Sequence, residues 1–128
     1  MNYAYDRRLA GVSIDAAEAR VRTALEAQGF GVLTEIDVKA TMKKKLDHDM
    51  PGYLILGACN PRLAKEAIGL EPRIGVMLPC NVILREIDGG TEISAVDPVA
   101  SMAAIENDAL HAVAGQVRDM LKAAVDAA

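Results

Sequence analysis

Tryptophan is absent from this sequence, and one phenylalanine and three tyrosines are its only aromatic residues. A core without large rings has to be built from aliphatic and small side chains, and hydrophobic residues make up 52% of the chain. A basic excess is also missing, because the formal net charge is -4. Without a positive patch for phosphates or aromatic rings for stacking bases, nucleic acid is not expected as a partner.

Long apolar runs are lacking as well. No stretch approaches the roughly 18 apolar residues of a membrane span, and Arg7 and Arg8 are not followed by the apolar region of a secretory signal. We therefore expect no membrane contact and a cytoplasmic location, where Cys59 and Cys80 are reduced thiols rather than a disulfide. His48 has no second His or Cys at zinc-finger spacing, so neither a metal nor another cofactor is expected.

The chain has the length of a single domain, residues 1–128. Its hydrophobic periodicity predicts the order β-α-β-α-β-α-β-β-α. Strands are expected at 3–10, 31–38, 53–59, 74–87 and 91–96, and helices at 14–28, 40–50, 61–69 and 101–128. This pattern predicts a domain of two layers, in which helices pack on a mixed sheet of about five strands.

The run YLILGAC at 53–59 is apolar on both faces, so we expect it inside the sheet with both faces covered. A strand, helix and strand in succession favour a parallel pair with a right-handed crossover. Cys59 lies six positions after Tyr53, and Cys80 lies six after Ile74. If these strands begin level, both thiols reach the sheet edge at which open α/β sheets bind ligands.

Proline inside the run of residues 74–87 is unusual, because it cannot donate a hydrogen bond to a neighbouring strand. We expect Pro79 to make the strand bulge and to aim Cys80 at a cavity shared with Cys59 and Asn60. Cys59 also precedes the N-cap of a helix, where the helix dipole lowers a thiol pKa. The alternative is that either cysteine is an inert, buried small hydrophobe.

Two further features remain open. In the last helix, alanine residues extend well beyond the single apolar stripe that would pack on a sheet. They indicate either self-association or only the high helix propensity of alanine. An enzyme would need Asp37, Glu92 or Asp97 beside a thiol nucleophile. However, Asp97 precedes Pro98 as turn residues do, and no G-x-G-x-x-G, G-x-S-x-G or H-E-x-x-H motif is present. We lean against an enzyme.

Three segments carry a resemblance to a known family: GACNP at 57–61, LPCNV at 78–82 and DP at 97–98. With these motifs, the chain resembles the prokaryotic family called domain of unknown function 302. The resemblance implies a small α+β domain that forms homodimers, and it brings no catalytic activity. It also implies a candidate site made of the motif residues Cys59, Asn60, Pro61, Pro79, Cys80, Asn81, Asp97 and Pro98. Of these, the ligand-binding candidates are Cys59, Asn60, Pro79, Cys80, Asn81 and Asp97.

Three functional hypotheses follow. The first is a cytosolic, homodimeric module that binds a small molecule, a sulfur species or a redox partner near the two cysteines. The second is a non-catalytic assembly protein that acts through its alanine-rich last helix. The third, and the least favoured, is a thiol-dependent enzyme.

Overall fold

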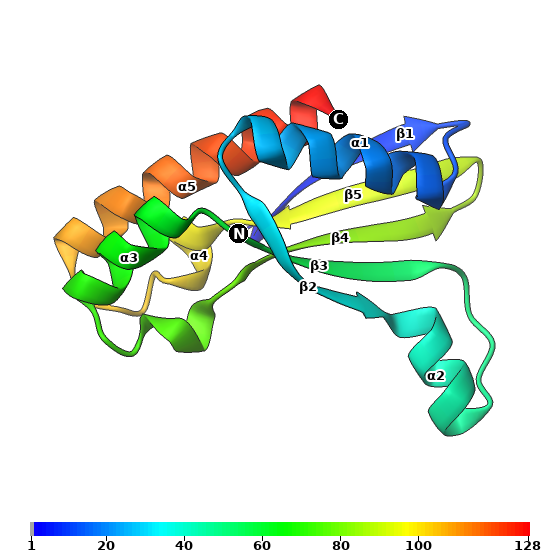
Figure 1. Ribbon diagram of the computed structural model, residues 1–128, viewed down its shortest axis with the longest axis horizontal. Helices are drawn as coiled ribbons and strands as arrows, with labels where there is room; N and C mark the ends of the chain where they lie inside the picture. The colour runs from blue at the N-terminus through cyan, green and yellow to red at the C-terminus, as the bar shows by residue number, and fades with distance from the viewer. Residues whose placement is uncertain (1) are drawn as a thin grey trace.

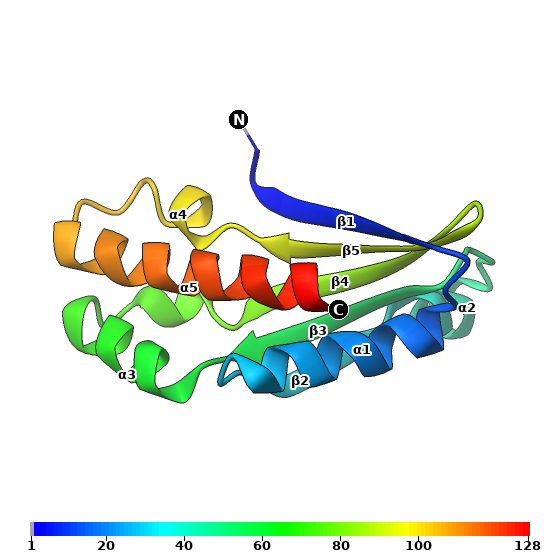
Figure 2. The ribbon, with the colours of Figure 1, turned by 90° about the horizontal axis from the view of Figure 1, so that it is seen from above.

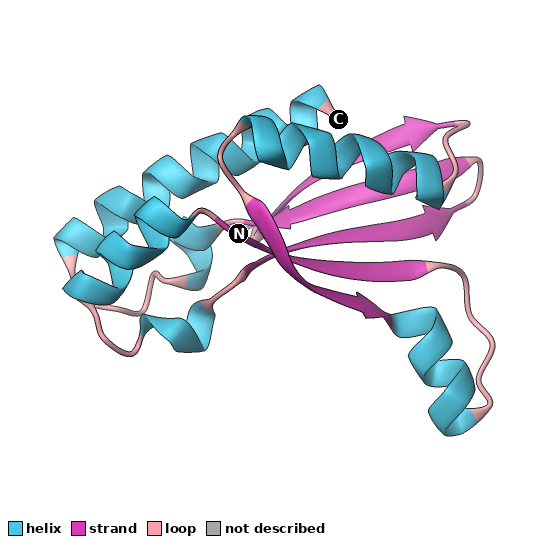
Figure 3. Ribbon diagram, in the orientation of Figure 1, coloured by secondary structure: helices cyan, strands magenta, loops and turns pink. Residues whose placement is uncertain are grey.

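The computed structural model describes residues 2–128 and has two layers, with its two longest helices above a sheet (Figures 1 and 3). The strands are β1 (Ala4–Ala10), β2 (Gly31–Asp37), β3 (Tyr53–Cys59), β4 (Cys80–Ile87) and β5 (Gly90–Val96). The helices are α1 (Ile14–Ala27), α2 (Val38–Leu46), α3 (Pro61–Leu70), the 3-10 helix η1 (Ile74–Met77), α4 (Pro98–Ser101) and α5 (Asp108–Ala127). The α+β class and the order of the main elements are confirmed.

The five strands form one sheet in the order β1-β5-β4-β3-β2, and every neighbouring pair is antiparallel. The expected mixed sheet, with β3 parallel to β4, is therefore wrong. Helix α3 does not return along the sheet as a crossover helix does, but lies beyond the end of β3 (Figure 1). The chain therefore enters β4 at the end where it left β3, which makes the pair antiparallel.

Helices α1 and α5 lie side by side on one face of the sheet (Figures 1 and 2). Ser13 caps α1 by accepting a hydrogen bond from the Ala16 amide, and Gly29 ends the helix with φ at +82°. The core between helices and sheet is aliphatic, as expected from the composition. Its fully buried side chains include Leu25 of α1, Leu56 of β3, Leu84 of β4, Ile93 of β5 and Leu121 of α5.

A second cluster of buried side chains lies beyond the end of the sheet, where α3, η1 and α4 meet the first half of α5. Its buried members are Leu63, Ala67, Ile74, Met102, Leu110, Val113 and Ala114. The predicted strand at 74–87 begins too early, because η1 occupies residues 74–77. The predicted helix at 101–128 also begins too early, because α4 ends at Ser101 and α5 begins only at Asp108. Asn107 starts α5 by accepting a hydrogen bond from the Leu110 amide at 3.0 Å.

The width of the apolar surface on α5 is explained by contacts within the chain. Leu110 and Ala114 are 0% and 2% exposed, because α5 packs against α1, α3, α4 and the sheet. In contrast, the sheet face away from α1 and α5 is not covered along its length by any helix of residues 2–128 (Figures 1 and 2). The expectation that β3 is covered on both faces therefore fails within the described chain. No helix in this part of the protein is long and apolar enough to cross a membrane.

Candidate functional site

Cys59 and Cys80 lie at the same end of the sheet, on two neighbouring inner strands. Cys59 is the last residue of β3 and Cys80 is the first residue of β4, and Ala58 pairs directly with Cys80. The two cysteines therefore come together as predicted, although the cause is antiparallel pairing rather than matched parallel strands. Both thiols are free.

Pro79 stands immediately before β4 and not inside it, so the predicted bulge at this position is wrong. A strand start is one of the places where the missing amide hydrogen of proline costs little. The register shift in this sheet lies instead in β2, between Val32 and Thr34. The Leu78–Pro79 peptide bond is cis.

Gly57 of β3 allows the Pro79 ring to approach the sheet. A Cβ atom at Gly57 would lie 2.7 Å from Cγ of Pro79 and would also collide with the Thr34 side chain of β2. Real Cβ atoms essentially never approach other atoms so closely. The glycine of the GACNP segment is therefore a packing requirement, which fixes the segment before Cys80 against β3.

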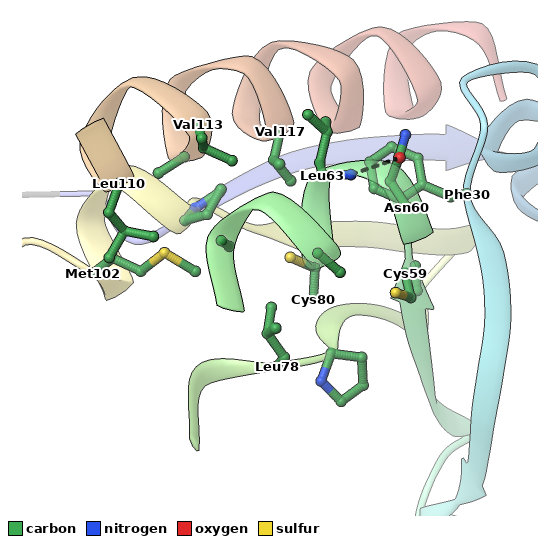
Figure 4. Close-up of a pocket in the computed structure, with 16 residues that line it drawn as sticks. Phe30, Cys59, Asn60, Leu63, Leu78, Cys80, Met102, Leu110, Val113 and Val117 are labelled. Atoms are coloured by element: carbon green, nitrogen blue, oxygen red, sulfur yellow. Dashed lines mark hydrogen bonds between the residues drawn. The ribbon is translucent and has the colours of Figure 1, made fainter. Parts of the chain in front are cut away.

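Behind the two cysteines lies a small cavity between the ends of β3 and β4 and the helices α3, α4 and α5 (Figure 4). Its volume is about 30 Å³, and Asn60 is its only lining side chain that is neither apolar nor sulfur-containing. Three lining residues carry sulfur, namely Cys59, Cys80 and Met102. The other twelve are Phe30, Ala58, Leu63, Ala64, Ala67, Leu78, Pro79, Pro98, Leu110, Val113, Ala114 and Val117.

The two thiols differ in their surroundings. Cys80 is only 6% exposed, and burial, followed by the proximity of Cys59, raises its pKa to about 11. Cys80 therefore stays protonated at neutral pH and is a poor nucleophile. Cys59 is half-buried, so it is the more accessible of the pair.

Asn60 holds the start of α3 in place. Its Oδ1 accepts a hydrogen bond from the Leu63 amide at 3.3 Å, and its Nδ2 donates to the Gln28 carbonyl at 3.4 Å. Only 8% of Asn60 is exposed, and its side chain has partners on both its oxygen and its nitrogen. Asn60 therefore ties the end of α1 to the start of α3 directly after Cys59, and its amide is already committed to the protein.

The remaining predicted residues lie outside the cavity lining. Asn81 is exposed, and because it alternates with Cys80 and Val82 it belongs to the uncovered sheet face. Asp97 caps α4 by accepting hydrogen bonds from the amides of Val99 and Ala100, at 2.9 and 3.4 Å. Of the six predicted residues, the structure thus gathers Cys59, Asn60, Pro79 and Cys80.

The carboxylates considered for an enzyme are engaged elsewhere. Asp37 caps α2 by accepting a hydrogen bond from the Ala40 amide at 2.9 Å. Glu92 lies on the uncovered sheet face, where it pairs with Arg85 at 2.8 Å and with Arg8 at 3.4 Å. Neither residue lines the cavity. Residues 2–128 also contain no group of three or more His, Cys, Asp or Glu side chains that could hold a metal.

Sequence reasoning missed two prominent members of the cavity wall, Phe30 and Met102. Met102 follows the Asp97-Pro98 pair closely and ends the segment VDPVASM, so its place beside that pair could have marked it as a candidate site residue. Phe30 gave none, because its position directly after Gly29 indicates only an apolar contact at the end of α1.

Fold and site together define a small α+β domain with a wholly antiparallel sheet and two free cysteines beside an apolar cavity. The chain belongs to the family described as domain of unknown function DUF302, whose model matches residues 5–128. It is similar to the structure titled "Crystal structure of uncharacterized conserved protein DUF302 from Bacillus stearothermophilus". The two share 24% sequence identity over 98% of each chain, with a TM-score of 0.92, which shows a common fold. The comparison with curated proteins gave no match.

Proposed function

We propose that this protein is a cytoplasmic, thiol-bearing binding module in which Cys59 contacts a small molecule, a sulfur species or a redox partner. The observation that carries the proposal is the shared cavity, which an accessible thiol and a buried thiol line together. An isolated buried cysteine would be explained as a small hydrophobe. Packing alone does not explain why a second, half-buried cysteine lines the same cavity.

The cavity limits the kind of ligand. Pockets for drug-sized molecules measure roughly 300–1,000 Å³, whereas this cavity measures about 30 Å³. It therefore has room for a group of only a few atoms, and its lining favours an uncharged or soft, polarizable one. A small sulfur species or the tip of a partner's thiol matches both the size and the chemistry.

The two cysteines have different roles in this proposal. Cys59 is the contacting thiol because it is the more accessible of the two. Cys80 stays neutral because burial raises its pKa to about 11, so it contributes a polarizable wall rather than a second nucleophile. Asn60 and Pro79 hold these two residues in place through their contacts with Leu63, Gln28 and Gly57.

Thiol alkylation tests the proposal. Reduced protein is treated with iodoacetamide across a pH series, and the modified sites are followed by mass spectrometry in the wild type, Cys59→Ser and Cys80→Ser. We expect one thiol per folded chain to react, with the reaction lost in Cys59→Ser and kept in Cys80→Ser. The second thiol should react only after the chain is unfolded in urea. If Cys59 is as inert as Cys80 in the folded protein, the proposal fails.

Glutathione disulfide is the probe for the redox arm of the proposal. Attack of the Cys59 thiolate on one sulfur of the probe forms a mixed disulfide and releases one glutathione thiolate. We expect this adduct on Cys59 in the wild type and in Cys80→Ser. Alkylation of Cys59 without adduct formation would favour a non-covalent ligand over a thiol-exchange partner.

The alternatives have less support. The carboxylates of the enzyme hypothesis act as helix caps or lie in an ion pair on the other sheet face. Assembly through α5 would need outward-facing apolar side chains, yet the larger ones of this helix pack inside the chain. Uncovered isoleucines lie instead on the sheet face that carries no helix.

A further inference from the structure

The sheet face opposite α1 and α5, which we call the open face, carries aligned rows of side chains. Register places Asp6, Ser94, Ile83, Ile55 and Ile36 in one row across all five strands. The adjacent row consists of Arg8, Glu92, Arg85 and Tyr53. Within these two rows, the apolar side chains thus lie over β2, β3 and β4, and the charged ones lie over β1, β5 and β4.

The apolar part is unusual for a face in contact with water. Antiparallel sheets with one solvated face usually alternate apolar residues inward and polar residues outward. Here Ile83, Ile55 and Ile36 stand side by side on three neighbouring strands. Ile36 is 48% exposed, and Ile55 and Ile83 are half-buried. Scattered apolar residues on a surface need no explanation, but a contiguous patch marks a site of contact.

The size of the open face suits a second copy of this chain. Five strands spaced by about 4.8 Å, each rising about 3.3 Å per residue over some seven residues, present a projected area of roughly 500 Å². Side chains make the accessible area larger than this projection. A stable protein interface buries about 800 Å² on each partner, so a dimer would use most of this face.

The charges on the open face are self-complementary. Arg8 and Asp6 lie two residues apart on β1, in neighbouring rows. A two-fold axis that lies in the interface, perpendicular to the strands and between these rows, places Arg8 over Asp6 of the other copy. The same axis places Tyr53 over Ile55 and Arg85 over Ile83 of the other copy. Opposite charges therefore meet on β1, while the tyrosine ring and the aliphatic stem of Arg85, which stays paired with Glu92, cover the two isoleucines.

We propose that the open face is the interface of a homodimer, in which a second copy covers the isoleucine row. This also accounts for strand β3, whose sequence is apolar on both faces although the chain covers only one. The proposal goes beyond the thiol site and is argued from other residues, because Asp6, Arg8, Ile36, Ile55 and Ile83 do not line the cavity.

Sedimentation equilibrium from about 1 to about 100 µM tests this interface. We expect the wild type to sediment at about twice the chain mass of 13.6 kDa. Ile36→Lys should raise the dissociation constant at least about tenfold, because it places a charge in the apolar part of the interface. Ile68→Lys on α3 is the matched control, because Ile68 is also 48% exposed but lies away from the open face.

Exchanging the charges of Asp6 and Arg8 provides a second test of the interface that does not depend on replacing an apolar residue. Arg8→Asp should weaken the dimer, and adding Asp6→Arg to the same chain should restore much of the affinity. Circular dichroism verifies that each variant is folded. A monomeric wild type at about 100 µM would overturn the proposal, as would a dimer that neither Ile36→Lys nor Arg8→Asp weakens. Equal losses in Arg8→Asp and the double variant would overturn the pairing of Asp6 with Arg8.

Discussion

At the scale of single residues, burial keeps Cys80 a neutral thiol at neutral pH. Leu110, Val113 and Val117 of α5 line the cavity together with Cys80. Because these residues lie far along the chain, the burial of the thiol could not be predicted from the sequence. The positions of Cys59, Asn60, Pro79 and Cys80 could be predicted, because a proline beside a cysteine and a helix cap beside a cysteine are both unusual patterns.

The raised pKa of Cys80 predicts a loss of stability at high pH. In the unfolded chain this thiol ionises near its ordinary value of 9.0, whereas in the folded protein it does so at about 11. The stability that the protonated Cys80 thiol gives the folded protein is therefore fully present below pH 9, and it is lost as the pH rises from 9 towards 11. Linkage gives a decrease of about 1–2 kcal/mol in the free energy of unfolding near pH 10.

Urea unfolding at pH 7.5 and pH 10 measures this loss. Cys80→Ala is the control, because it lacks the titrating thiol while lysines and tyrosines still titrate. We expect the variant to lose about 1–2 kcal/mol less than the wild type between the two pH values. Equal losses in both proteins would show that Cys80 ionises as easily in the folded protein as in the unfolded chain.

At the scale of elements, the strands and long helices were predictable because their periodicity and caps are strong. Ser13 and Gly29 limit α1, and Asn60 with Pro61 begins α3. The errors fell where an apolar run is short. Residues 74–77 read as the start of a strand, but they form a 3-10 helix that buries Ile74 and leaves Val76 83% exposed. Tertiary contacts decide such segments, because local propensity does not distinguish them.

The contact of β2, β3 and the segment before β4 at Gly57 gives a prediction at this scale. We expect Gly57→Ala to lower the free energy of unfolding by about 1–3 kcal/mol, because its Cβ atom would press on Thr34 and Pro79. Gly115→Ala in α5 is the matched control. A Cβ atom there meets nothing within 4 Å, and alanine favours the helix by about 0.5–1 kcal/mol.

Urea denaturation of the two alanine variants decides the role of Gly57. A second variant, Gly57→Ala with Thr34→Ala, removes the hydroxyl that the new Cβ atom would meet and should recover part of the loss. If Gly57→Ala is as stable as Gly115→Ala, then β2 and Pro79 can move apart freely and Gly57 does not fix the segment before Cys80.

At the scale of the whole molecule, the class of fold was predictable and the sheet topology was not. A strand, helix and strand in sequence usually form a parallel pair, and this expectation fails because α3 lies beyond the sheet. If a second copy covers the open face, then the apolar pattern of β3 correctly indicated a strand that is covered on both faces. The sequence reports that a face is apolar, but it does not report which chain covers it.

A homodimer through the open face makes thermal stability depend on protein concentration. Dissociation accompanies unfolding, so mass action raises Tm as the chain concentration rises. With an unfolding enthalpy of about 0.7 kcal/mol per residue, two chains of this length give an increase of about 2–3 °C for each tenfold in concentration. Scanning calorimetry or fluorescence-dye melts at about 1, 10 and 100 µM measure this increase in Tm.

Two variants serve as controls for the concentration dependence of Tm. Ile68→Lys should keep this dependence and Ile36→Lys should flatten it, because only Ile36 lies in the proposed interface. A wild-type Tm that is the same at all three concentrations would contradict a dimer whose dissociation is coupled to unfolding.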